Sequence, residues 1–205
     1  MHVPDGFLNA PTLIATNAVM FSALAPAIRR INRELSPERI PLMGVAAAFV
    51  FAVQLIRFPI PGGTTAHISG AVLIAVLLGP FTGLAIITAA LFLQALLFGH
   101  GGLLTLGANV MNIGVIGCLL GYGVYRILPT KSNFGAGVAA WIATLLAALA
   151  CAAELGYSGR MDLETALVGM GGAHSILGVV EALVTMAVLS FLGKIRPDLL
   201  EIEKV

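Results

Sequence analysis

The sequence predicts an all-α, polytopic membrane protein with seven transmembrane helices, and three observations lead to that fold class. Hydrophobic residues make up 59% of the 205 residues and charged residues only 10%, whereas soluble domains carry roughly 25% charged residues. Long apolar stretches recur along the whole chain between charged, Gly or Pro residues, as membrane-spanning helices require. Lys and Arg gather in alternate loops, a pattern that sets the orientation of helices in a membrane. We therefore treat residues 1–205 as a single transmembrane domain.

The seven expected spans follow from the length of each apolar stretch. A bilayer core requires about 20 apolar residues per helix, within a range of about 17–25. In chain order, the apolar stretches are 11–28, 41–57, 68–79, 81–98, 103–125, 135–155 and 173–193. The third stretch is short for a full crossing, and Gly79-Pro80 separates it from the fourth. We expect these two stretches to form a tight helical pair whose break is protected by neighbouring protein.

The distribution of Lys and Arg predicts an outer N-terminus and a cytoplasmic C-terminus. With Met1 outside, the outer side holds only Arg57 and Arg160 of the eleven Lys and Arg residues. The inner loops and tail hold Arg29, Arg30, Arg33, Arg39, Arg126, Lys131, Lys194, Arg196 and Lys204. Under this orientation the segments 58–70 and 99–102 share the outer face with Met1.

The N-terminal stretch MHVPDGF is a candidate metal chelate. It lacks the basic opening and the small-residue cleavage site of a secretory signal, so we expect Met1 to be retained with a free amine. The amine, the deprotonated amide nitrogen of His2 and the Nδ1 of its imidazole would then place three nitrogens in one plane. Cu(II) and Ni(II) favour such a planar nitrogen field, whereas Zn(II) prefers tetrahedral sites. One in-plane position stays open, so this chelate requires a fourth donor.

The best candidate for the fourth donor is His67, in the outer segment FPIPGGTTAHISG. No carboxylate or cysteine occurs in that segment, so His67 would act as a neutral donor. Asp5 and Gly6 favour a tight turn, and we expect residues 1–10 to form a metal-binding segment that folds back into the bundle. A lone histidine in a Gly-rich loop commonly makes only hydrogen bonds, and that interpretation remains open at this point.

Four stretches resemble the CbiM/NikM family, the substrate-binding membrane (S) components of energy-coupling factor (ECF) transporters for nickel and cobalt. They are MHVPDGFL, GGTTAHISG, FGHGGLLTLGANVMNIGVIG at 98–117 and GAHSILGVVEALVT at 172–185. The resemblance covers nearly the whole chain and is greatest for the nickel members, NikM. It implies a six-helix S-component core with an extra N-terminal helix, and a metal ion held by Met1, His2 and His67. GGTTAHISG departs from the Ser/Cys-rich pattern with His-Pro of the cobalt members, so Ni(II) is the favoured cargo and Co(II) the alternative.

The same resemblance implies partners rather than catalysis. A multi-pass subunit of this kind, in a bacterial inner (cell) membrane, captures the ion for an ATP-driven importer that contains a coupling transmembrane subunit and two ATPase subunits. A small accessory membrane subunit is a further option. The chain lacks the GxxxxGK[ST] loop that binds nucleotide phosphates, so ATP hydrolysis must come from those partners. We expect no enzyme activity, no resident cofactor and, at a formal net charge of +1, no nucleic-acid partner.

Other polar residues are candidates for hydrogen bonds that orient the metal ligands. These residues are His100, Asn109, Asn112, Thr65 and Ser69. Helix capping for His100 and helix-to-helix bonding for the two asparagines are the alternatives. We further expect Glu181 to orient a ligand or receive a partner subunit, Glu154 to be solvated near the outer surface, and His174 to bond to a neighbouring helix.

Two other functional classes were weighed against a capture subunit. A stand-alone metal/proton secondary transporter would need buried carboxylates along a path, and Glu181 is the only acid expected well inside a span. A membrane enzyme with a metal-activated water would need an open coordination position and a general base. A closed planar site with four nitrogens leaves little room for that, so the sequence favours capture.

Overall fold

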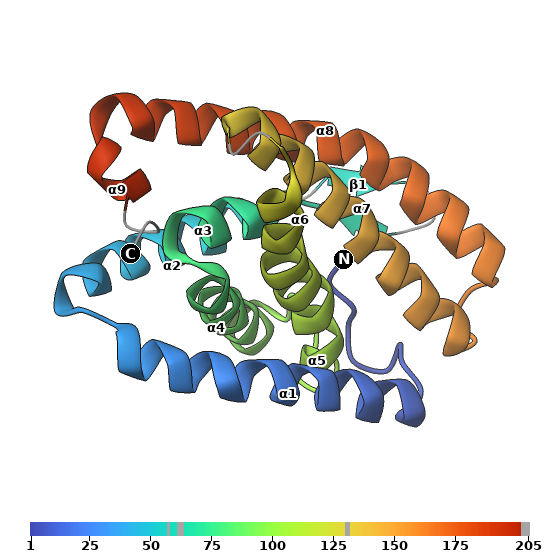
Figure 1. The fold of residues 1–205 in the computed structure, drawn as a ribbon. Helices are drawn as coiled ribbons and strands as arrows, with labels where there is room; N and C mark the ends of the chain where they lie inside the picture. Colours follow the sequence, from blue (N-terminus) through green and yellow to red (C-terminus); the bar gives the residue numbers. More distant parts are fainter. Residues whose placement is uncertain (57, 61–63, 130–131, 202–205) are drawn as a thin grey trace.

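The computed structural model describes residues 1–56, 58–60, 64–129 and 132–201, and it shows a bundle of helices with one short hairpin (Figure 1). The longest helices are α1 (Ala10–Glu34), α2 (Ile40–Leu55), α4 (Pro80–Phe98), α7 (Asn133–Tyr157) and α8 (Leu163–Ile195). Between α4 and α7 the chain forms α5 (Leu106–Asn109), the π-helical segment η2 (Val110–Leu120) and α6 (Gly121–Ile127). The shorter elements are the 3₁₀ turn η1 (Pro37–Arg39), strands β1 (Phe58–Ile60) and β2 (Thr64–Ala66), α3 (Ala71–Leu78) and α9 (Pro197–Glu201).

Six helical segments of the described chain are long and apolar enough to cross a membrane. They are Ala10–Glu34, Pro37–Leu55, Pro80–Phe98, Leu106–Ile127, Asn133–Tyr157 and Leu163–Ile195. The prediction of a multi-pass helical membrane protein is therefore confirmed. The third expected span, 68–79, supplies only α3, whose 8 residues extend about 12 Å at 1.5 Å per residue. By itself α3 is too short to cross the bilayer core.

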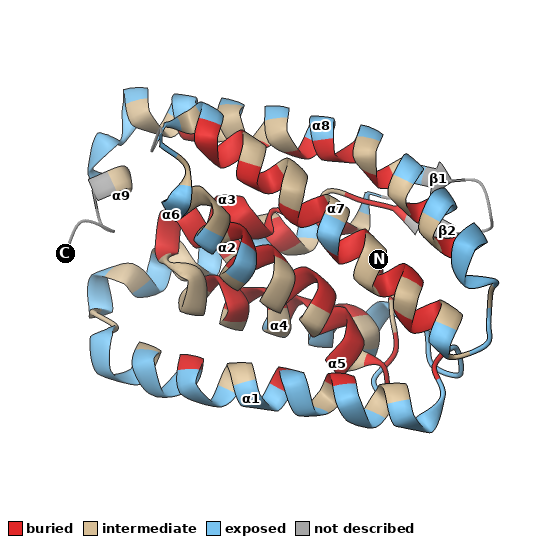
Figure 2. Cartoon of the chain, turned by 45° about the vertical axis from the view of Figure 1, so that its right-hand side comes forward, coloured by how far each residue is buried: buried red, intermediate tan, exposed pale blue. Residues whose placement is uncertain are grey.

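Helix α3 forms the centre of the core. All eight of its residues, AVLIAVLL, are buried, with side chains no more than 9% exposed (Figure 2). A helix that is apolar on every side is typically surrounded by protein or lipid, and here protein surrounds it. The expected break is confirmed, because α3 ends at Gly79, whose φ is +86°, and α4 begins at Pro80.

Glycines let the neighbouring helices pack closely against α3. A Cβ atom at Gly117 would lie 2.6 Å from the Cβ of Ala71, and one at Gly121 would lie 2.6 Å from Cγ2 of Val72. Small residues permit this approach, and van der Waals packing replaces the hydrophobic effect between helices in lipid. The small-residue spacing in this part of the sequence therefore serves packing within the chain.

Helix α8 begins ten residues earlier than the predicted span 173–193, at Leu163. The side chain of Asp162 accepts a hydrogen bond from Thr165 N and caps the helix, a typical N-cap interaction. The prediction missed this extension because it followed apolar residues alone, and the first turn of α8 contains the charged Glu164.

Strand β1 pairs antiparallel with β2, with Phe58 opposite Ala66. The chain therefore turns back on itself between α2 and α3, and it delivers residues 67–70 to the interior. The N-terminal segment ends in the same region, and Figure 1 shows the N-terminus inside the bundle. Met1, Val3 and Leu8 are buried, with exposures of 4%, 2% and 6%.

Substituting Gly117→Ala is expected to destabilise the protein by about 1–3 kcal/mol, because the added methyl group overpacks the contact with Ala71. The matched control is Gly123→Ala in α6, where an added Cβ meets no atom within 4 Å and where alanine gains about 0.5–1 kcal/mol over glycine in a helix. Thermal unfolding in detergent measures both variants. Two equal shifts of the melting temperature would contradict the close packing of η2 against α3.

Candidate metal centre

Three imidazole rings lie together at the inner end of the N-terminal segment. The centroid of the His2 ring lies 4.5 Å from that of His67 and 3.9 Å from that of His100, and the last two are 6.0 Å apart. The rings come from the N-terminal segment, the loop after β2 and the turn after α4. His67 and His100 are buried and His2 is partly buried. The structure thus brings together the two histidines predicted as ligands and adds His100 beside them.

The Nε2 atom of His2 lies 3.2 Å from Oε1 of Gln94. Gln94 donates from Nε2 to the main-chain oxygen of Phe51 at 3.3 Å, which turns its own carbonyl oxygen toward His2. An amide oxygen can only accept, so His2 donates from Nε2. Its Nδ1 therefore holds a lone pair, and this atom is buried without a hydrogen-bond partner. Nδ1 is the nitrogen that the predicted chelate requires.

The ring of His67 has the opposite arrangement. Its Nδ1 lies 3.1 Å from the main-chain oxygen of Ile68, an acceptor, so Nδ1 donates and Nε2 holds the lone pair. Nε2 of His67 is also buried without a partner. A buried acceptor without a partner costs about 1–3 kcal/mol. At metal sites, a histidine usually donates a hydrogen bond from one ring nitrogen, and this bond orients the other nitrogen toward the metal. Two neighbouring rings thus present buried nitrogens that accept no hydrogen bond from the described residues.

The N-terminal amine belongs to the same cluster. Burial lowers the pKa of the Met1 amine below its ordinary value, while the nearby Cys151 and Glu154 act in the opposite direction. Burial is also the main cause that lowers the pKa values of His2 and His67. The charge of the amine lowers the pKa of His67 further, so the amine and this ring lie within electrostatic reach. All three groups therefore favour the neutral form, which is the form that donates a lone pair to a metal.

Side chains alone do not complete a metal site in the described residues. No group of three or more His, Cys, Asp or Glu residues there has the placement to hold a metal ion. A metal ion at the histidine cluster therefore needs other donors, and the buried amine of Met1 and the amide of His2 are adjacent. Amine, amide and imidazole nitrogens together suit Ni(II) and Cu(II).

Hydrogen bonds to Val3 hold the N-terminal segment in this position. Val3 N donates to Oδ1 of Asn109 at 2.7 Å, and Nδ2 of Asn109 donates to the oxygen of Val3 at 3.1 Å. The hydroxyl of Thr105 donates to the same oxygen at 2.6 Å. Asn109 was expected to bond to a ligand imidazole or to another helix. It binds the main chain two residues from Met1 instead, and so positions the chelating residues indirectly.

A second set of contacts closes the N-terminal segment at its surface. The Asp5 carboxylate accepts hydrogen bonds from the main-chain nitrogens of Leu103, Leu104 and Thr105 at 3.1, 2.9 and 3.1 Å. A side chain at Gly102 would overlap this carboxylate, which explains one glycine of the GHGG stretch.

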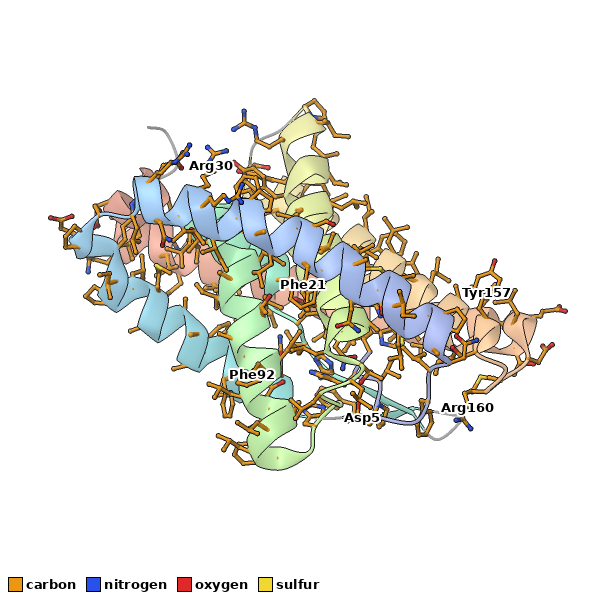
Figure 3. The ribbon with its side chains drawn as sticks, turned by 90° about the horizontal axis from the view of Figure 1, so that it is seen from below. Asp5, Phe21, Arg30, Phe92, Tyr157 and Arg160 are labelled. Atoms are coloured by element: carbon orange, nitrogen blue, oxygen red, sulfur yellow. The ribbon has the colours of Figure 1, made fainter. Side chains whose placement is uncertain are left out.

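On the other side of the segment, Arg160 donates to the main-chain oxygens of Gly6 and Phe7. Figure 3 shows Asp5 and Arg160 at the same end of the molecule. Asn9 continues this set of contacts, because its Nδ2 donates to the oxygen of Tyr157 at 3.0 Å. The N-terminal segment is thus fastened from both sides.

Glu181 of α8 supports the loop that carries His67. Its carboxylate accepts from Ser69 N at 2.7 Å, from the Ser69 hydroxyl at 2.9 Å and from Gly70 N at 2.8 Å. Gln54 of α2 donates to the oxygen of Ser69 at 2.9 Å. Ser69 therefore links the His67 loop to two helices rather than bonding to an imidazole. Glu181 was expected either to orient a ligand or to receive a partner subunit. Its hydrogen bonds fix the loop that carries the predicted ligand His67, which fits the first of these roles.

Two other expectations, those for Glu154 and His174, are wrong. Glu154 is buried, not solvated, because it faces η2 and accepts from Nδ2 of Asn112 at 2.8 Å. Asn112 therefore bonds between helices and not to a histidine ring. His174 donates from Nδ1 to Met170 of its own helix at 2.9 Å, so it is not the inter-helix donor that we expected. The side chain of Thr65 lies outside the described part of the structure.

Sequence reasoning missed Gln94, Asp5 and Arg160 as supporting residues. Gln94 carried a usable signal, since an amide inside the apolar run LFLQALLF needs a hydrogen-bond partner within the bundle. Asp5 was read only as a turn residue and Arg160 only as an outer charge. Their partners are main-chain atoms more than 90 residues away, and no local pattern marks such pairs.

Comparison with known proteins identifies the family of this chain. The CbiM family, described as the cobalt uptake substrate-specific transmembrane region, matches residues 2–199. A protein of Haloquadratum walsbyi that is named for metal transport is 41% identical over 204 residues, which cover 97% of this chain and 93% of that protein. The fused nickel transport protein NikMN of Rhodobacter capsulatus is 34% identical over 225 residues, which cover 98% of this chain and 64% of the longer fused protein.

The fold is similar to a solved structure as well. The crystal structure of a truncated transition metal transporter has a TM-score of 0.90 and 36% sequence identity, and the match covers 95% of this chain and 99% of that chain. Family, relatives and fold point to transport and not to enzyme catalysis. This chain therefore belongs to the CbiM family of nickel and cobalt transport proteins.

Proposed function

We propose that this chain is the substrate-binding (S) component of an ECF importer and that it captures Ni(II) through four nitrogens in a plane. The donors are the Met1 amine, the His2 amide, the Nδ1 atom of His2 and the Nε2 atom of His67. The observation that carries this proposal is the pair of buried ring nitrogens without partners, Nδ1 of His2 and Nε2 of His67. They lie on rings whose centroids are 4.5 Å apart, and each is the nitrogen left free by the hydrogen bond on the other side of its ring.

The donor set favours Ni(II) over the other first-row ions that the family transports. Ionising the amide of His2 requires a metal that gains strongly from a planar nitrogen field, and tetragonal nitrogen sites are typical of Ni(II) and Cu(II). The ionised amide also removes one positive charge from the buried ion, and Glu154 lies near the amine. Co(II) remains the alternative cargo. His100 lies against the face of the His2 ring, and if it acted as a fifth ligand, the site would favour Co(II).

The rest of the proposed role follows from the orientation of the bundle. The metal centre faces the outside and the C-terminus lies in the cytoplasm of a bacterial cell. The segment 68–79, which contains α3, is the third of seven membrane segments and is enclosed by the others. Helix α1 is the extra N-terminal helix added to a six-helix core. A coupling subunit and two ATPase subunits, with or without a small accessory subunit, then move the ion inward. In support, Arg30, Arg39 and Arg126 all lie at the end of the bundle opposite the histidines.

Vesicle uptake separates this role from a stand-alone secondary transporter. Purified chain in vesicles is expected to bind Ni(II) without accumulating it, whereas vesicles that also hold the coupling and ATPase subunits accumulate it with ATP. Glu181 is engaged in three hydrogen bonds to the His67 loop, so it is poorly suited to carry protons. Uptake driven by a proton gradient through the chain alone would contradict the proposal.

His67→Ala is expected to weaken Ni(II) binding at least a hundredfold, because it removes one of four in-plane nitrogens. His100→Ala is expected to weaken it less than tenfold, because His100 lies beside the plane. Isothermal titration calorimetry measures both affinities, and the visible spectrum of the wild type should show a yellow, diamagnetic, planar complex. If the two variants rank in the opposite order, His100 and not His67 is the ligand.

Inserting a leucine between Met1 and His2 is expected to uncouple the N-terminus from His67. The histidine then stands third, and a second backbone amide takes the fourth in-plane position. Any Ni(II) affinity that remains should therefore be the same with and without the additional change His67→Ala, whereas in the wild-type chain that change is costly. Thermal melting without metal checks that the inserted chain still folds. A continued dependence on His67 would argue against the amine as a donor.

Gln94→Leu is expected to lower the Ni(II) affinity about 10–100-fold, the usual effect of losing a residue that orients a metal-bound histidine. The change removes the acceptor that holds the proton on Nε2 of His2 and leaves Nδ1 free to take it. Thr88→Val is the control on the same helix, because the Thr88 hydroxyl bonds only to Leu84 of its own helix. Equal affinities for the two variants would show that Gln94 does not orient the ring.

A further inference from the structure

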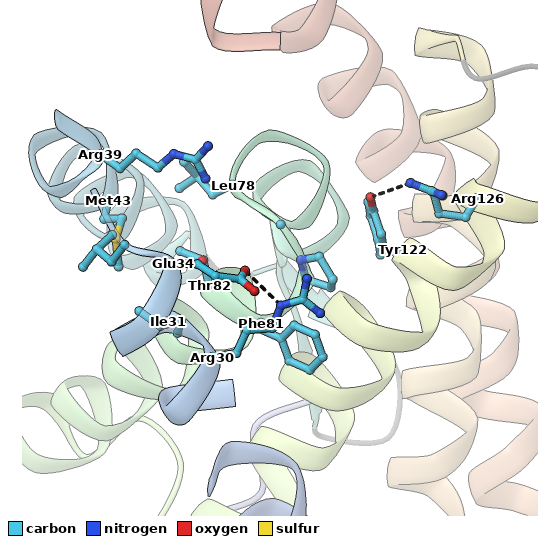
Figure 4. A pocket seen from close by; sticks show the side chains of 13 residues that line it. Arg30, Ile31, Glu34, Arg39, Met43, Leu78, Phe81, Thr82, Tyr122 and Arg126 are labelled. Carbon is cyan, nitrogen blue, oxygen red and sulfur yellow. Dashed lines mark hydrogen bonds and ion pairs between the residues drawn. The ribbon is translucent and has the colours of Figure 1, made fainter. Parts of the chain in front are cut away.

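A second polar site lies at the end of the bundle opposite the histidines. It is a pocket of about 340 Å³ between α1, η1, α2, the α3–α4 turn and α6 (Figure 4). The pocket lies where α1 ends and α4 begins, whereas the histidines lie where α1 begins and α4 ends. The 19 residues of α4 extend about 28 Å, so the pocket is separate from the metal centre.

The pocket is lined by an excess of positive charge. Arg30, Arg39 and Arg126 approach it from three different elements, and among the described residues of its lining Glu34 is the one acid. Glu34 pairs with Arg30 at 3.0 Å, which leaves a net charge of +2 from these four residues. Arginine binds phosphate oxygens through a planar fork of donors, so the lining suits a phosphate group.

Neighbouring groups favour an anion in the same place. The guanidinium of Arg30 lies 5.0 Å from the ring centroid of Phe81, which holds it at the pocket wall. The first turn of α4 reaches the pocket at Phe81 and Thr82, and Gly79 offers no side chain to cap that helix. The positive end of the helix dipole therefore adds to the arginine charges.

An apolar groove adjoins this pocket. The groove has a volume of about 180 Å³ and runs between α2, α3, α8 and α9. The described residues that line it are all apolar, among them Phe49, Ile74 and Val188. Leu78 lines both the groove and the pocket. One ligand that joins an anionic head to a hydrocarbon chain would therefore fill both.

We propose that the pocket and the groove together bind one anionic glycerophospholipid. Its phosphate lies among Arg30, Arg39 and Arg126, and one acyl chain runs past Leu78 into the groove. Basic pockets between transmembrane helices commonly bind anionic headgroups, and Arg30 and Arg126 lie at the ends of two candidate spans, where headgroups are found. Free phosphate would not fill the groove, and an apolar helix of another subunit would supply no phosphate to the arginines.

The test compares lipids that share acyl chains and differ in the headgroup. Full-length protein in a neutral detergent is melted with added phosphatidylglycerol, phosphatidylcholine or inorganic phosphate, and lipid affinity is read by native mass spectrometry. Phosphatidylglycerol is expected to raise the melting temperature, bind at least tenfold more tightly than phosphatidylcholine, and act at concentrations at which inorganic phosphate has no effect. Equal binding of the two lipids, or an equal effect of inorganic phosphate, would overturn the proposal.

Variants locate the site. The double change Arg39→Gln and Arg126→Gln should remove the preference for phosphatidylglycerol. The matched control is the double change Arg29→Gln and Arg33→Gln outside the pocket, which should keep that preference. Val45 lines the groove and is 66% exposed, so Val45→Trp can fill the groove without disturbing the core. It should weaken binding of phosphatidylglycerol. Unchanged lipid binding by Val45→Trp together with lost binding of the coupling subunit would assign the groove to that subunit and overturn the proposal.

Circular dichroism and the melting temperature without lipid check that each variant folds. If the double arginine variant fails to fold, the single change Arg126→Gln replaces it, because Arg126 is exposed and contacts Tyr122 of its own helix. The single variant should lose at least fivefold in affinity for phosphatidylglycerol and none for phosphatidylcholine. Equal losses for both lipids would contradict a role of this arginine in binding the headgroup.

Discussion

Burial of the chain's own N-terminus is the constraint on which the rest of the structure depends. A buried ammonium group costs several kcal/mol of desolvation, and burial accordingly lowers the pKa of the Met1 amine. The bundle supplies polar partners for the main chain that follows, from Asn109 and Thr105 to Val3. The chain has few polar side chains, and several of those inside the bundle form hydrogen bonds to the N-terminal segment. This burial is the reason for proposing the Met1 amine as a metal donor.

The loop that carries His67 forms the second half of the candidate site, and hydrogen bonds from two helices hold it in place. The hairpin of β1 and β2 turns the chain inward, and Glu181 and Gln54 bind the loop at Ser69 and Gly70. Helix α3 then begins at Ala71, four residues after His67, in the most buried part of the protein. His67 is therefore placed by rigid elements, whereas His2 is placed by a segment that lies along them. The proposed chelate would therefore join the N-terminal segment to a loop that two helices hold in place.

The sequence predicts the membrane class, the break at Gly79-Pro80 and the proximity of His2 to His67, because these follow from composition, local turn chemistry and loop orientation. It does not distinguish α3 from a lipid-facing span, since apolar residues suit burial in lipid and in protein equally. Nor does it place Glu154, because hydropathy locates a residue along a helix and not around it. Asp5 and Arg160 escape prediction for a related reason, as their partners are backbone atoms of distant segments.

The two sets of N-terminal contacts differ in how readily they break. Asn109 bonds to Val3 in the buried interior, where an unmade hydrogen bond costs about 1–3 kcal/mol per group. The bonds of Arg160, and those of Asp5 to Leu103 and Leu104, are exposed, and water replaces them at a net cost of about 0.5–1.5 kcal/mol each. Segments held by exposed bonds open locally without global unfolding. The surface contacts of the N-terminal segment are therefore weaker than its buried contacts, and Asn109 and Thr105 hold its inner end most firmly.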